Sequence, residues 1–276
     1  MARKRLFCEL GPLAYKISLK KQILTRHLKN LFSAENFAIT RSKEPLKEIV
    51  YSVSNNMIKR GPGINPEHQF NKAENIRLAC SKINGLIINP GESFSFWQLV
   101  GNTSRKHGFL DGRILKNGKL VAGVGGGLCN LANSLHIVVM HSPMTVTELH
   151  HHSDALAPDE GGVRNPYSAG TSVNYNFIDF RFRNDTDSKV QLLTYCCGDD
   201  LTVELRTDQP FPESYQIVEE DHHFTKEDNG CYYRKSKIYR ETIDKATGLV
   251  KKRELKWDNK SKVMFDPSLI PTDQIR

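Results

Sequence analysis

The sequence contains no long apolar run. No stretch of the 276 residues approaches the roughly 18 apolar residues that a membrane-spanning helix requires, so no transmembrane segment is expected. Residues 1–22 (MARKRLFCELGPLAYKISLKKQ) start with positive charge but lack the apolar segment that follows the basic start of a secretory signal. We therefore expect a cytoplasmic protein, and its basic ends leave association with an anionic membrane surface open.

Cysteine is scarce and its spacing carries no metal or disulfide signature. The six cysteines follow neither a zinc-ligand spacing nor the pattern of a small disulfide-stabilised domain, so free thiols are expected. Glycine-rich residues 123–127 are not followed by the Gly-Lys-Ser/Thr of a P-loop, and GxGxxG is absent. The sequence therefore predicts no cofactor and no metal.

Acidic residues are fewer than basic ones. Lys and Arg total 39 against 31 for Asp and Glu, which gives a formal net charge of +8. An excess of positive charge favours an anionic partner such as nucleic acid, a membrane or an acidic polymer, although a solvated basic surface is the simpler interpretation. Because no recognisable nucleic-acid-binding module accompanies the basic segments, we do not expect nucleic acid as a partner.

The order of patterns predicts an α+β protein. Residues 1–60 have the pattern of a basic, helical N-terminal extension that includes FSAENFAI and EPLKEIVYSV, and GPGINP (61–66) ends it. Apolar spacing predicts helices at 70–84 and 128–140, and Asn117-Gly118 predicts a hairpin. Alternation predicts three strands within 171–207 and more in the tail. We expect a mainly antiparallel sheet with a few helices, divided into 1–60, a main domain at 61–210 and a β-rich extension at 211–276.

The segment GVGGGLCNLANSLH raises the central question about function. Gly125, Gly126 and Gly127 precede a predicted helix whose first turn contains Cys129. The helix dipole and the orphan N–H groups at such a start would lower the thiol pKa and could hold an oxyanion, as acyl transfer requires. The competing interpretation is a tight structural turn followed by a buried thiol.

A cysteine nucleophile needs a base. His136 lies seven residues after Cys129, about 10.5 Å along a helix, which is too far for a hydrogen bond. His150 and His152, at the end of the strand that follows this helix, are the better candidates, because an antiparallel return would bring them to the helix start. The His150–His152 run together with Cys129 could instead form a zinc site, a weaker alternative.

Other residues could line the same cleft. Asn130 and Asn133 lie near Cys129 on the helix, Glu92 follows the Pro90-Gly91 turn, and Arg164 lies in GGVRNPY. These four are candidate substrate-binding residues, with the three glycines as candidate oxyanion donors. Asp179 and Arg181 share one face of a predicted strand, which is typical of a structural ion pair rather than of a site.

Three segments resemble the VanW family: NGLIINPGESFSFWQLVG, NGKLVAGVGGGLCNLANSLH and IDFRFRNDTD, in this order within residues 65–210. The family occurs in glycopeptide-resistance clusters and widely in Gram-positive bacteria. Some members act as cysteine L,D-transpeptidases on peptidoglycan stem peptides. The resemblance implies Cys129 as the nucleophile, helix-start amides as oxyanion donors and His150 or His152 as the base. It also implies a peptidoglycan precursor or stem peptide as partner. Asn130 replaces the glutamine usual after this cysteine.

A second function remains open from the sequence. The chain could be a non-catalytic accessory or binding protein of a resistance or envelope pathway. In that case Cys129 would be a slowly reacting thiol, and its replacement would leave function intact.

Overall fold

The computed structural model describes residues 6–60, 64–116, 119–155, 158–159, 166 and 170–276. These residues form four α-helices and thirteen strands in mainly antiparallel sheets, which confirms the α+β prediction. The helices are α1 (Pro12–Phe32), α2 (Pro66–Ile83), α3 (Phe96–Val100) and α4 (Leu128–Met140). The strands are β1 (Glu48–Asn56), β2 (Leu86–Ile88), β3 (Ser93–Ser95), β4 (Asp111–Lys116), β5 (Lys119–Val124), β6 (Thr145–Glu148), β7 (Asp154–Ala155), β8 (Arg181–Arg183), β9 (Val190–Cys197), β10 (Asp200–Thr207), β11 (Glu213–Lys226), β12 (Tyr232–Asp244) and β13 (Val250–Val263).

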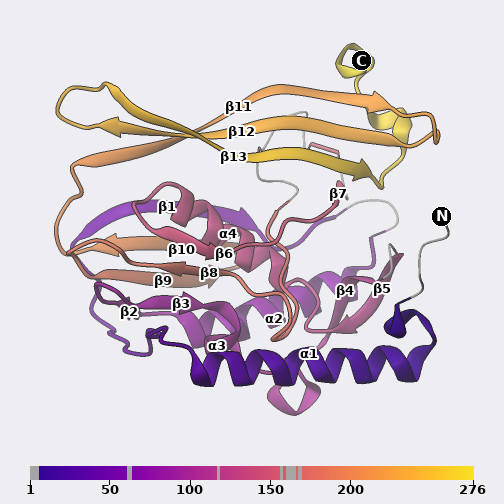
Figure 1. The fold of residues 1–276 in the computed structure, drawn as a ribbon, viewed down its shortest axis with the longest axis horizontal. Helices are drawn as coiled ribbons and strands as arrows, with labels where there is room; N and C mark the ends of the chain where they lie inside the picture. Colours follow the sequence, from indigo (N-terminus) through magenta and orange to yellow (C-terminus); the bar gives the residue numbers. More distant parts are fainter. Residues whose placement is uncertain (1–5, 61–63, 117–118, 156–157, 160–165, 167–169) are drawn as a thin grey trace.

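The molecule is built in layers (Figure 1). The long strands β11, β12 and β13 form one side, α1 runs along the opposite side, and the central sheet with α4 lies between them. The central sheet has the order β1-β10-β9-β2, with each neighbouring pair antiparallel. Its buried residues, such as Leu192, Val203 and Leu205, pack into one core with the apolar faces of α2 and α4.

Helices α2 and α4 begin for different local reasons. The Asn65 side chain accepts hydrogen bonds from the backbone N–H groups of Glu67 and His68, and Pro66 fits the first helical position. Helix α4 instead begins after Gly127, whose φ of 99° is a left-handed conformation that favours glycine. The predicted helix at 128–140 is therefore confirmed, and the pairing of β4 with β5 confirms the hairpin. The tip of that hairpin, Asn117-Gly118, lies outside the described residues.

The helical prediction for EPLKEIVYSV is wrong. Residues Glu48–Asn56 form strand β1, which pairs with β10 in the central sheet. From Tyr51 onward the burial alternates, since Tyr51 and Val53 are partly buried and Ser52 is exposed, which suits a half-buried strand. Pairing with a distant strand decides the conformation of such a short segment. The basic N-terminal segment is thus helical only in part. Whether 1–60, 61–210 and 211–276 behave as separate domains stays a prediction, although β1 completes the sheet of the second segment.

The C-terminal sheet rests on the outer side of α4. Ile137 and Met140 of α4 form a small apolar cluster with Tyr51, Val53 and Ile217 of β11. The His151 ring stacks on the Trp257 ring of β13, with 4.0 Å between centroids and 3° between planes. The β-rich character predicted for the tail is confirmed, since three strands of 13 or 14 residues account for most of it.

Candidate functional site

Cys129 is the second residue of α4 and lines a cavity of about 400 Å³. The start of α2, the β4–β5 hairpin, the glycine loop and residues 172–178 form the other walls. The residue as a whole is partly buried, and its Sγ lies 3.7 Å from the backbone oxygen of Val173. The cysteine singled out by sequence therefore lies in a cleft large enough for part of a peptide.

The cleft is lined by positive charge. Lys59, Lys72 and Arg113 contribute three cations, and His68 and His152 add two imidazoles. No Asp or Glu occurs among the described residues that line this cavity. Cations gathered without an acidic partner in their own cavity favour an anionic ligand.

The pKa of Lys72 is lowered in this cleft. Burial lowers its pKa to about 8, and the neighbouring charges of Lys59 and Arg113 act in the same direction. The side chain also packs beside the helix start, because a Cβ added at Gly127 would lie 2.2 Å from Lys72 Cγ. Sequence patterns missed this lysine, since in α2 it resembles any polar residue of an amphipathic helix.

The thiol of Cys129 is protonated at neutral pH. Burial raises its pKa, while backbone hydrogen bonding at Val173 and at Cys129 itself lowers the pKa by less. The expectation of a lowered thiol pKa is therefore wrong. The physical reason is that loss of hydration outweighs the backbone hydrogen bonds that favour the thiolate.

The glycine loop has a structural explanation. The Gly125 N–H donates to the Leu110 oxygen at 2.9 Å, and the Gly126 N–H donates to the Gly123 oxygen at 3.2 Å. A Cβ at Gly126 would lie 2.3 Å from the backbone carbon of Gly112, so the loop and β4 are in direct backbone contact. Contrary to expectation, the N–H groups of Gly125 and Gly126 are thus already engaged and are not free to donate to an oxyanion. That role is left to the amides at the start of α4, which follow Gly127.

The side chains of the three consecutive histidines lie in three different surroundings. His152 lines the Cys129 cleft, and burial lowers the pKa of its imidazole, which favours the neutral form that can accept a proton. His150 does not line the cleft, contrary to expectation, because its Nε2 lies 3.3 Å from Glu148 Oε1. The strand pairing is irregular between Val146 and Glu148, so the alternation assumed from sequence does not continue to His150. His151 faces Trp257 instead.

The remaining predicted site residues are dispersed. Asn130 lines the cleft, and its buried Oδ1 has no hydrogen-bond partner among the described residues. Asn133 lines a different cavity, and its Oδ1 accepts from the Thr171 N–H at 3.3 Å. Glu92 is also outside the cleft, since its Oε2 accepts from the backbone N–H of Asn89 at 2.8 Å within the turn between β2 and β3. Arg164 lies outside the described residues.

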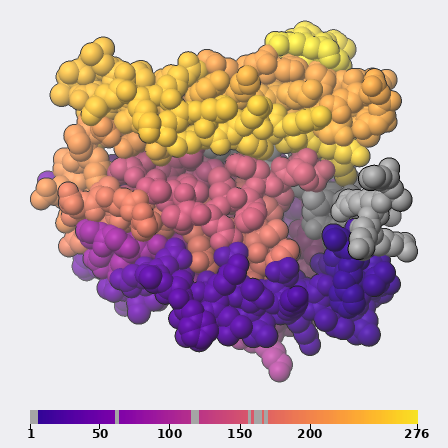
Figure 2. Space-filling model, viewed as in Figure 1, coloured from indigo at the N-terminus to yellow at the C-terminus, as the bar shows by residue number. Residues whose placement is uncertain are grey.

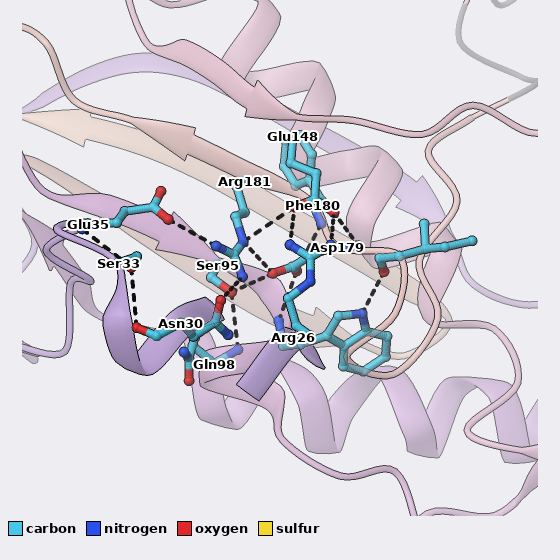
Figure 3. A network of polar contacts seen from close by, with 12 residues as sticks. Arg26, Asn30, Ser33, Glu35, Ser95, Gln98, Glu148, Asp179, Phe180 and Arg181 are labelled. Atoms are coloured by element: carbon cyan, nitrogen blue, oxygen red, sulfur yellow. Dashed lines mark hydrogen bonds and ion pairs between the residues drawn. The ribbon is translucent and has the colours of Figure 1, made fainter. Parts of the chain in front are cut away.

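Asp179 and Arg181 form a structural pair, as predicted (Figure 3). The Arg181 Nε donates to Asp179 Oδ2 at 2.8 Å, and the Ser95 hydroxyl donates to the same oxygen at 2.6 Å. Arg181 reaches α1 through Asn30 Oδ1 at 2.7 Å and the segment after α1 through Glu35 Oε2 at 2.9 Å. This network attaches α1 to the body of the protein, and it reaches the Cys129 cleft through Trp97, whose backbone N–H donates to Asp179 Oδ1 and which lines the cavity.

Two negative findings apply to the described residues. They contain no group of three or more His, Cys, Asp or Glu side chains placed to hold a metal ion. Among the described residues, none of the helices combines the length and the hydrophobicity needed to cross a membrane.

Comparisons with known proteins agree with the motifs. The family model described as VanW like protein matches residues 71–206. The chain is 27% identical over 231 residues to the Vancomycin B-type resistance protein VanW of Enterococcus faecalis. The aligned residues cover 83% of this chain and 82% of that protein. It is 26% identical over 137 residues to the uncharacterized protein YoaR of Bacillus subtilis, covering 49% of this chain and 42% of that protein. No solved structure matches. Residues 71–206 therefore match the VanW family, and the similarity to the E. faecalis protein extends over most of the chain.

Proposed function

We propose that the Cys129 cleft binds a carboxylate-bearing peptide of the peptidoglycan type and that Cys129 accepts an acyl group from it. The observation that carries the proposal is a cavity that combines a thiol with three cations and contains no acidic side chain among its described residues. Peptidoglycan precursors and stem peptides carry free carboxylates that such cations would pair with. The E. faecalis relative is named for vancomycin resistance, and this substrate class is the one that the resemblance to the VanW family implies.

The acyl-transfer step requires proton removal during the attack, since Cys129 is protonated at rest. His152 accepts the thiol proton, and the sulfur attacks the carbonyl carbon of a peptide amide. The developing oxyanion receives hydrogen bonds from the amides at the start of α4. The C–N bond then breaks, the leaving amine takes the proton from His152, and a thioester remains on Cys129. The nitrogen of an acceptor amine then attacks the thioester carbonyl, a new C–N bond forms as the C–S bond breaks, and His152 passes the proton of that amine to the sulfur, which restores the thiol.

Lys72, Lys59 and Arg113 position the substrate. A bound carboxylate relieves the mutual repulsion of the three cations and keeps Lys72 charged, because an anion raises a lysine pKa. The cations thus supply affinity, and Cys129 with His152 supplies the chemistry.

A second function is favoured by one specific observation. The raised pKa of Cys129 suits a thiol that does not react, in which case the cleft binds its peptide without acyl transfer. The chain would then act as an accessory protein that sequesters or presents a cell-wall precursor.

Mass spectrometry after incubation with muropeptides separates the two functions. Acyl transfer predicts a peptide adduct on Cys129 in the wild type and none in Cys129→Ser. Cys197 is exposed and lies outside the cleft, so Cys197→Ser is the matched control and keeps the adduct. Binding without an adduct, at equal affinity in wild type and Cys129→Ser, establishes the accessory role. Absence of both adduct and binding contradicts both functions.

A further inference from the structure

Helix α1 exposes an apolar stripe along the outer side of the molecule. Figure 2 shows α1 in indigo along the face opposite the C-terminal sheet. Leu13, Leu31 and Phe32 are 72%, 74% and 80% exposed, and Ile17, Leu24 and Leu28 are also exposed. The spacing of 13, 17, 24, 28 and 31 places these side chains on one face of a helix. Leu6, Phe7 and Leu10, just before α1, extend the exposed apolar surface.

The opposite face of α1 is attached to the protein. Arg26 forms a two-pronged ion pair with Glu148, with distances of 2.6 and 2.7 Å (Figure 3). Asn30 accepts from Arg181, and the Asn176 side chain donates to the backbone oxygen of Ile23. These contacts fix the rotation of the helix about its axis. The apolar stripe is therefore held outward and is not free to turn toward the core.

The charged side chains of α1 itself are all positive. Helix α1 contains Lys16, Lys20, Lys21 and Lys29, all exposed, and has no Asp or Glu over its 21 residues. The other basic run, at 251–256, is different, because Lys251 pairs with Glu213 and Arg253 with Glu220. The lysines of α1 thus lie on a helix that offers them no acidic partner, unlike the basic residues at 251–256.

We infer that the outer face of α1 docks on an anionic lipid bilayer and lies in its interfacial plane. Leucine, isoleucine and phenylalanine would enter the acyl-chain boundary, while the lysines contact anionic headgroups. Lys20 and Lys21 lie between Ile17 and Leu24 along the stripe, and long lysine stems can extend from an apolar surface to reach headgroups. The inference concerns a surface separate from the Cys129 cleft and does not depend on acyl transfer.

The charge pattern argues against a second copy of this chain as the occupant. Two α1 helices paired through their stripes would bring Lys20 and Lys21 of both copies together with no acidic side chain on either helix. Paired helices ordinarily use opposite charges beside an apolar seam. An anionic surface is the partner that removes this repulsion.

The test is vesicle cosedimentation of the full chain. We expect binding to vesicles of equal parts phosphatidylglycerol and phosphatidylcholine, little binding to phosphatidylcholine alone, and release by high salt. The double variant Leu24→Asp/Leu28→Asp should lower the partition coefficient at least about tenfold. The matched control is Leu249→Asp, which replaces a leucine that is 67% exposed on the β12–β13 connection and should bind as wild type does.

Lys20→Gln/Lys21→Gln is a second variant that leaves the leucines intact. It should weaken binding to the anionic vesicles, with an unchanged thermal unfolding midpoint. The inference is overturned if wild type ignores anionic vesicles, if Leu24→Asp/Leu28→Asp binds as wild type does, or if Leu249→Asp loses binding equally. A dimer in solution that the leucine variant converts to monomer, without vesicle binding, would assign the stripe to a second copy and also overturn it.

Discussion

The Lys72 side chain lies directly against Gly127, the residue that precedes α4. A Cβ at Gly127 would fall 2.2 Å from Lys72 Cγ, and Gly127 has a left-handed φ of 99°. This contact brings an amine with a lowered pKa beside the helix start that carries Cys129. The glycine loop therefore admits both the thiol and the lysine to one cavity.

Peptide affinity should fall as pH rises through about 8, the pKa of Lys72. Below this value Lys72 carries a charge that pairs with a carboxylate, and above it the amine is neutral while the carboxylate stays ionised. We expect about a tenfold loss of affinity between pH 7 and pH 9, equivalent to about 1.4 kcal/mol. Calorimetric titration of a stem peptide at each pH measures it. Lys72→Arg keeps its charge throughout and should flatten the profile; an unchanged profile in that variant would remove Lys72 from the account.

Cys129 should react slowly with iodoacetamide at neutral pH. Burial raises its thiol pKa, so the thiolate that reacts becomes abundant only in alkaline solution. Exposed Cys197 in the same chain is the internal reference. We expect alkylation of Cys197 at pH 7.5 to be clearly faster than alkylation of Cys129, because the buried thiol is the less ionised and the less accessible of the two. Peptide mapping by mass spectrometry follows both sites, and faster labelling of Cys129 would refute the protonated resting state.

Gly126→Ala should destabilise the protein more than Gly198→Ala does. The new Cβ at 126 would lie 2.3 Å from the Gly112 backbone, whereas a Cβ at 198 meets no atom within 4 Å and adds only the strain of a positive φ. Displacing β4 against the loop should cost about 1–3 kcal/mol, as overpacking usually does. Urea unfolding of the two variants gives the comparison. Equal losses would show that the loop can move away from β4 at no cost.

Arg181→Met should destabilise the fold strongly. The substitution leaves the buried carboxylate of Asp179 without its cation and removes the contacts to Asn30 and Glu35, a change that costs about 3–5 kcal/mol for a buried pair. Arg183→Ala, two residues later in β8, removes an exposed pair with Asp185 and should change stability little. Denaturant midpoints measure both. A small effect of Arg181→Met would mean that the network of Figure 3 does not hold α1 in place.

Local patterns predicted much of the fold because each element encodes its own buried face. Helix α4 begins and ends where apolar spacing and the preceding glycines indicated, and β10 buries Leu201, Val203 and Leu205 in strict alternation. Strand β1 was mistaken for a helix because a short apolar segment fits both periods. Its strand identity comes from pairing with β10, about 150 residues away, which no local pattern reports.

The site was only half predictable for the same reason. Cys129 and His152 were identified from a glycine-rich helix start and a nearby histidine run. Lys59, Lys72 and Arg113 come from separate segments, and only the folded chain brings them to one cavity. The pKa of Cys129 depends on burial, which the sequence does not report, so the helix dipole alone led to the wrong sign.

The most direct test of the account is the affinity of a carboxylate-bearing stem peptide for wild type and for Lys72→Gln, measured by calorimetry at pH 7. The control is Lys106→Gln, which changes an exposed lysine outside the cleft and leaves the same net charge as Lys72→Gln. We predict that wild type and Lys106→Gln bind the peptide equally and that Lys72→Gln binds it about tenfold more weakly, the equivalent of one lost charge-assisted contact. Equal binding by all three proteins, or binding by none, would contradict the assignment of the Cys129 cleft as the peptide site.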